Sequence, residues 1–122
     1  MINGKQSKNP MYGENRKYPK RTRITIPDVV EKFPCGVTLT HVKLTDTKYG
    51  ENVICHIKDD DTVYFFGGKL MTSDIHELAD GYRNGVDGLN KHMERVGGFH
   101  LDFIEEEGKN GNTYYSPDIT TD

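Results

Sequence analysis

Three runs of alternating apolar and polar residues lie close together between Val37 and Phe66, and they constrain the fold more than any other part of the chain. The first two runs flank residues 46–51, and the third, residues 62–66, follows three consecutive aspartates. Successive side chains of a β-strand point to opposite faces, so such alternation indicates strands joined by polar turns. The region therefore predicts a three-stranded antiparallel meander.

The same alternation predicts which face of the meander is buried. Val53, Cys55 and Ile57 share one face of the second run and are the expected core. The opposite face then carries four large side chains: Ile54, His56, Tyr64 and Phe66. Three of these side chains are rings. Beside Lys48 and Lys69, they suit stacking on unpaired bases whose phosphates contact the lysines. The alternative is that both faces are buried, as in a sandwich or a dimer, because large exposed apolar side chains usually have a partner.

The first run changes register near His41. Val37 and Leu39 occupy odd positions, whereas Val42 and Leu44 occupy even positions. One extra residue in the strand, a β-bulge, would bring all four apolar side chains to the same face. The sequence therefore predicts a bulged first strand.

Residues on both sides of the meander predict further elements. Residues 23–26 alternate and predict a short edge strand that Pro27 ends. Residues 27–33 then predict one helical turn, with proline at an early position. At the other end, residues 99–104 and 113–116 flank a glycine-containing turn and predict a final hairpin, whose expected inward side chains are Phe99, Leu101 and Phe103.

The segment between the meander and this hairpin has helical periodicity. Apolar residues recur at steps of three and four between Met71 and Val96. Glycines weaken the pattern and predict two short helices that meet near residues 84–85, rather than one long helix. Thr72 or Ser73 is the expected N-cap, and residues 97–98, both glycine, are the expected end. The predicted element order is β-β-β-α-β-β.

Charge is distributed unevenly along the 122 residues. The chain carries a net charge of −3, but residues 1–23 sum to +6 and the remainder to −9. Residues 1–22 are rich in Asn, Gly, Lys and Pro, so we expect a disordered basic N-terminal arm. The arm and the residue after it supply cations that could contact phosphates, namely Arg16, Lys17, Arg21 and Arg23. The alternative is a solvated leader whose charge only aids solubility.

Several classes of protein lack support in the sequence. No run approaches the roughly 18 apolar residues of a membrane span, and the N-terminus has no apolar signal core. We therefore expect a cytoplasmic protein that does not bind membranes. Cys35 and Cys55 lack the spacing of a zinc knuckle or a redox pair, and the position of Cys55 predicts a buried free thiol.

Catalytic and metal-binding motifs are also missing. Residues 67–69 resemble a fragment of a phosphate-binding loop without its other glycine or its Ser or Thr. Residues 59–61, three aspartates, lack the spacing of a calcium loop and predict a hairpin turn. The five histidines show no spacing typical of a pair of metal ligands. We expect no enzyme activity, no metal and no cofactor.

The element order is that of the OB-fold, a five-stranded, partly open β-barrel. The turn at residues 47–51, between two strands and followed by Val63-Tyr64-Phe65-Phe66, resembles the small OB-fold single-stranded-DNA-binding proteins of bacteriophages and mobile elements. The resemblance covers about residues 37–116. It implies a mainly β OB-fold domain at residues 23–116, with a helical segment between the third and fourth strands and a short C-terminal tail at residues 117–122.

The resemblance also implies a function and a site. The expected function is sequence-tolerant binding of single-stranded DNA, or of RNA, in replication or recombination. The implied groove crosses the second and third strands and is bordered by two loops; its expected residues are Lys48, Tyr49, His56, Tyr64, Phe66, Lys69 and Lys109. Many bacterial single-stranded-DNA-binding proteins recruit replication enzymes through an acidic tail with an aromatic tip. This chain has no such tip, so recruitment through its tail is not expected.

A second function remains open at this point. The acidic runs at residues 59–61 and 105–107 would repel phosphate if they bordered the groove. The same OB scaffold would then be a protein-interaction module without nucleic-acid binding, and its aromatic patch would contact a partner protein or a second copy of the chain.

Overall fold

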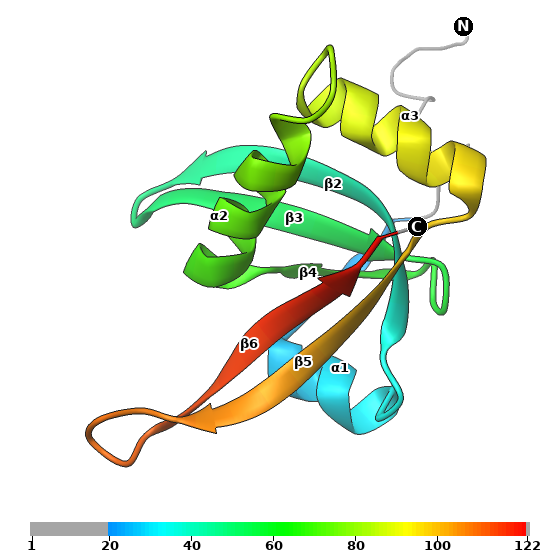
Figure 1. The fold of residues 1–122 in the computed structure, drawn as a ribbon. Coiled ribbons are helices and arrows are strands. Elements are labelled where there is room, and N and C mark those ends of the chain that lie inside the picture. The colour runs from blue at the N-terminus through cyan, green and yellow to red at the C-terminus, as the bar shows by residue number, and fades with distance from the viewer. Residues whose placement is uncertain (1–19, 122) are drawn as a thin grey trace, which may run out of the picture.

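The structure is a computed structural model and describes residues 20–121. Within these residues the fold is mainly β: six strands form one curled sheet, half of a barrel, with three helices (Figure 1). The strands are β1 (Thr22–Ile24), β2 (Val37–Thr47), β3 (Gly50–Ile57), β4 (Val63–Phe66), β5 (Phe99–Glu107) and β6 (Thr113–Thr120). The helices are α1 (Ile26–Lys32), α2 (Gly68–Ala79) and α3 (Val86–Val96).

The strand count differs from the five that we expected. The order across the sheet is β1-β4-β3-β2-β5-β6, and the sixth strand is β1. It pairs in parallel with β4, with Thr22 opposite Val63 and Ile24 opposite Phe65. Alternation predicted this strand at residues 23–26 as a short edge strand outside the barrel. Its parallel pairing with β4 leaves no local signal in the sequence, so the expected barrel had five strands.

The predicted meander and its bulge are confirmed. β2, β3 and β4 are consecutive antiparallel neighbours, and the register of β2 against β3 shifts between Leu39 and His41. β2 pairs with β5 only from Val37 to Leu39, whereas it pairs with β3 as far as Thr47. One long strand therefore belongs to both halves of the sheet, and the sheet curls around it (Figure 1).

The core lies between the inner face of this sheet and the helices α2 and α3. Inward residues of the meander alternate as predicted, and Phe65, Phe99 and Leu101 are completely or almost completely buried. The Cys55 thiol is buried, as predicted, and donates to the sulfur of Met71 at 3.7 Å. Burial raises the pKa of this thiol far above its ordinary value. Cys55 is therefore a packing residue.

The start of α2 differs from the expectation. The helix begins at Gly68, and Thr72 lies inside it, where the Thr72 hydroxyl donates to the Gly68 carbonyl oxygen at 2.7 Å. The Gly68 N–H donates instead to the side-chain oxygen of Asn52 on β3, at 3.0 Å. A residue 16 positions away in sequence caps this helix, so Thr72 and Ser73 are not needed as caps.

The predicted division into two helices is confirmed. α2 ends at Ala79 and α3 begins at Val86, directly after Gly85. α3 ends at Val96, and the next residue, Gly97, caps it with a left-handed φ of 88° that favours glycine. The helical connection between β4 and β5 is therefore a pair of helices, α2 and α3, that lies over the sheet (Figure 1).

The ends of the described chain also depart from the predicted boundaries. The first strand ends at Ile24 rather than Ile26, because Thr25 caps α1: its hydroxyl accepts from the Asp28 N–H, and the Asp28 carboxylate accepts from the Thr25 N–H at 3.0 Å. The last strand continues past Ser116 to Thr120, and Ile119 packs against the core opposite Leu101. None of the three helices within residues 20–121 has the length and apolar character needed to cross a membrane.

Candidate nucleic-acid interface

The outer face of β3 and β4 carries large side chains, because the alternation that buries Val53 and Phe65 turns their neighbours outward. Ile54 lies opposite Phe66, and His56 lies opposite Tyr64. All four are half-buried and line one hollow of about 350 Å³ together with Arg21 and Lys43. We call this hollow the ring groove.

The aromatic side chains at the ring groove contact one another in fixed geometries. The Tyr64 and Phe66 rings meet edge to face with centroids 6.1 Å apart. The His56 ring stacks on the His41 ring of β2, with centroids 5.4 Å apart and planes 25° from parallel. Packed rings have few rotamers left to lose, so this face can receive a flat ligand at a low entropic cost.

β1 and the residue before it bring two arginines to the same face. Arg23 lies opposite Tyr64 in the parallel register, and its guanidinium lies over the Phe66 ring, 4.3 Å from the centroid. A guanidinium that stacks through its face keeps its N–H groups free at the edge, where they can bind phosphate. The Nε atom of Arg21 is buried without a hydrogen-bond partner among residues 20–121. Arg23 is exposed and Arg21 lines the ring groove, so both can attract an anionic ligand, although the Arg21 Nε atom itself is out of its reach.

The histidines of the groove are neutral at pH 7. Partial burial, followed by the charge of Arg21, lowers the pKa of His56 to about 4. Burial also lowers the pKa of His41, with Arg21 and Lys43 adding to the effect and the acids Asp87 and Glu94 opposing it. The positive charge of the groove therefore comes from Arg21, Arg23 and Lys43, and the histidines contribute rings and hydrogen-bonding nitrogens.

The remaining predicted site residues lie elsewhere. Lys48 and Tyr49 form the turn between β2 and β3, where Tyr49 is 88% exposed and the Lys48 nitrogen is 5.1 Å from its ring. This turn is five residues beyond Lys43, which is roughly 16 Å along a strand. Lys69, on the first turn of α2, and Lys109, in the β5–β6 turn, are exposed but do not line the ring groove. Arg16 and Lys17 lie outside the described residues.

Sequence reasoning missed two contributors from β2. His41 stacks on His56, and Lys43 lies opposite Ile54 at the groove. The signal was present, because the predicted bulge turns Val42 and Leu44 inward and so turns His41 and Lys43 outward.

The acidic runs do not line the ring groove. Asp59 accepts from the Thr38 N–H at 2.7 Å, and Asp60 accepts from both the N–H and the hydroxyl of Thr62. These aspartates form the turn that the sequence predicted, and the Thr62 hydrogen bonds lower the pKa of Asp60. Residues 105–107 pair with residues 113–115 of β6. Within residues 20–121, no group of three or more His, Cys, Asp or Glu side chains could hold a metal ion.

No protein-family model, curated protein or solved structure matches this chain. Function must therefore be inferred from the chemistry of the ring groove. That chemistry combines stacked rings with three cations and has no carboxylate among the side chains that line the hollow. It suits a ligand with flat apolar surfaces and negative charges.

Proposed function

We propose that this protein is a non-catalytic, sequence-tolerant single-stranded-DNA-binding protein that uses the ring groove. The observation that carries the proposal is the concentration of Arg21, Arg23 and Lys43 around the Tyr64 and Phe66 rings, on a molecule whose net charge is −3. Because the protein as a whole is acidic, the positive charge of this ring-lined surface does not follow from the overall charge and indicates a specific anionic ligand.

Single-stranded DNA fits both halves of this surface. Its bases expose their π faces, and each base that stacks on an aromatic ring contributes about 1–3 kcal/mol. Its phosphates can bind the guanidinium groups and the Lys43 ammonium at the same time. A duplex has already stacked and paired its bases, so it can use the cations but not the rings. The groove should therefore prefer single strands.

We also infer that the fold is an OB barrel that is open on one side. The order β4-β3-β2-β5-β6, with a helical connection between β4 and β5, corresponds to an OB-fold without the pairing that closes the barrel. OB-folds bind oligonucleotides on the face of their second and third strands, here β3 and β4. On this proposal the protein acts in the cytoplasm, in phage or mobile-element DNA replication or recombination, beside other proteins of that process.

A second candidate is a protein-interaction module, and the β5–β6 hairpin favours it. Ile104 is 51% exposed on β5 and Tyr114 is 44% exposed on β6. Both belong to a hairpin that also carries Glu105 and its two acidic neighbours. An apolar surface beside acids would suit a basic partner protein or a second copy of the chain.

The decisive experiment is a fluorescence-anisotropy titration of the full chain with labelled single- and double-stranded oligonucleotides at low and moderate salt. Lys43→Glu reverses a charge in the ring groove, and Lys109→Glu is the matched control outside it. We expect saturable preference for single strands that falls as salt rises, strongly weakened by Lys43→Glu and little changed by Lys109→Glu. No binding at low salt, together with a change of oligomeric mass or partner capture on Ile104→Ser, would favour the interaction module.

A further inference from the structure

The ring groove continues beyond β3. A second hollow of about 680 Å³ shares Arg21 and His56 with it. A third hollow of about 610 Å³ lies between β2 and α3 and shares four residues with the second, namely Thr40, His41, Lys58 and Glu94. Each hollow thus shares lining residues with the next, from β4 across β3 and β2 to α3, and we call this row of hollows the trough.

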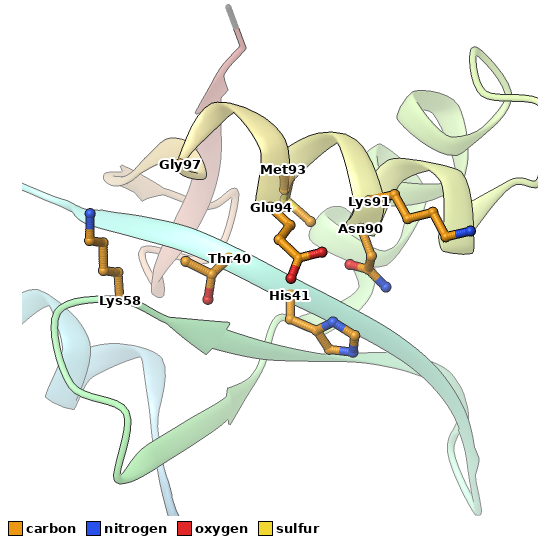
Figure 2. A pocket seen from close by; sticks show the side chains of 8 residues that line it. All are labelled: Thr40, His41, Lys58, Asn90, Lys91, Met93, Glu94 and Gly97. Carbon is orange, nitrogen blue, oxygen red and sulfur yellow. The ribbon is translucent and has the colours of Figure 1, made fainter.

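Figure 2 shows how the third hollow is built. Thr40 and His41 of β2 lie on one side, and the side chains of α3 lie on the other. Lys58, just after β3, and Lys91, on α3, stand at opposite ends, and Glu94 points toward His41 between them. The bulge in β2 is what turns His41 into this space.

Neither Lys58 nor Lys91 forms an ion pair with a carboxylate of residues 20–121. Within residues 20–121 the ion pairs are those of His76 with Glu51 and of His100 with Asp102, and neither includes a lysine or an arginine. The cations along the trough are Arg21, Lys43, Lys58 and Lys91, and its carboxylates are Asp61 and Glu94. The trough as a whole is thus net positive, with four cations against two carboxylates, although its middle hollow is balanced and the protein is net negative.

We propose that the single strand bound at the ring groove continues along the trough, over β2 and against α3, with phosphates at Lys58 and Lys91. This inference rests on the proposed function and adds α3 to the binding surface. Continuity with the ring groove and the two unneutralised lysines identify the occupant as the same polyanion. Between the two lysines, the His41 ring can stack on a base. Glu94 repels phosphate at the same place, so the contacts to the phosphates of the strand lie at Lys58 and Lys91.

The test compares oligothymidylates of roughly 6 and roughly 12 nucleotides, within the range that OB-folds cover. The double variant Lys58→Gln/Lys91→Gln is measured against Lys32→Gln/Lys109→Gln, a matched control at exposed lysines outside the trough. We expect the double variant to weaken binding of the longer oligonucleotide and leave the shorter one within about twofold. Its slope of log affinity against log salt should fall by about 1.4, or 0.7 for each lost phosphate contact.

Glu94→Gln supplies an independent readout with the opposite sign. Removing this carboxylate should strengthen binding of the longer oligonucleotide. The slope of log affinity against log salt should stay as in the unmodified protein, because Lys58 and Lys91 keep their phosphate contacts. If the longer oligonucleotide binds and neither the lysine variant nor Glu94→Gln changes its affinity, the extension over α3 is overturned and the ring groove stands. If the unmodified protein binds neither length at low salt, the proposed function is overturned together with the extension.

Discussion

The side chain of Asn90 forms two hydrogen bonds with the backbone of Val42. Its Nδ2 donates to the Val42 carbonyl oxygen at 2.8 Å, and its Oδ1 accepts from the Val42 N–H at 2.9 Å. β2 pairs with β5 only as far as Leu39, so Val42 has no neighbouring strand on that side. The amide on α3 replaces the missing strand, and the backbone groups of the bulged segment remain satisfied.

Asn90→Asp should therefore destabilise the protein. Aspartate retains the acceptor for the Val42 N–H but loses the donor and places negative charge against the Val42 carbonyl oxygen. We expect the free energy of unfolding to fall by about 1–3 kcal/mol, measured by urea denaturation at pH 7. Asn110→Asp makes the same chemical change at an exposed turn and should be nearly neutral. Equal effects of the two substitutions would refute this role of Asn90.

Local patterns in the sequence were sufficient for much of the fold. Alternation gave the meander, the odd-to-even change gave the bulge of β2, and glycine at positions 85 and 97 gave the limits of α3. Contacts between residues far apart in the sequence were missed, because they leave no local signal. The parallel pairing of β1 with β4 and the cap that Asn52 provides for α2 are both of this kind.

Gly67→Ala should be destabilising for a steric reason. The backbone of Gly67 has φ −75° and ψ −21°, which alanine adopts readily. An added Cβ, however, would lie 2.7 Å from a methyl carbon of Val53 and 2.8 Å from the Met71 sulfur, both in the core. We expect a loss of about 1–3 kcal/mol by thermal or urea unfolding.

Gly81→Ala is the matched control for that substitution. Its added Cβ would come no closer than 3.4 Å to the Leu78 carbonyl oxygen, and it should be neutral or stabilising by up to about 1 kcal/mol. Similar losses in both variants would show that backbone freedom, and not contact with Val53 and Met71, requires glycine at position 67.

Tyr64→Ala should lower the affinity for single-stranded DNA by about fivefold to 150-fold, which corresponds to the loss of one stacked base at about 1–3 kcal/mol. Tyr114→Ala removes the same side chain from the β5–β6 hairpin and should change affinity less than twofold. Anisotropy titrations at one fixed salt concentration compare the two. Should Tyr114→Ala prove the more damaging, the binding surface would lie on the hairpin.

Acidification should destabilise the protein through His56. Its pKa is about 4 in the folded state and about 6.5 in an unfolded chain. Between these values the unfolded state binds more protons, so stability is retained above pH 6.5 and falls as pH decreases toward 4. Urea midpoints between pH 7 and pH 4.5 should fall less steeply in His56→Gln. An unchanged slope would mean that other groups, His41 among them, account for the dependence.

The candidate site was predictable only in part. The alternation of strand side chains predicted His56, Tyr64 and Phe66 on one outer face, and the structure brings them together. Lys48, Lys69 and Lys109 belong to turns and a helix start whose positions in space depend on the whole sheet, and they do not line the groove. Position in an alternating strand can be derived from neighbours, but the direction in which a turn projects cannot.

The pairing of β1 with β4 also determines where the arginines at the start of the described chain act. Arg21 lines the ring groove, and the Arg23 guanidinium lies over the Phe66 ring. Both come from the cationic start of a chain whose net charge is −3. A substitution that unpairs this three-residue strand would therefore remove positive charge from the groove without changing an arginine or an aromatic ring.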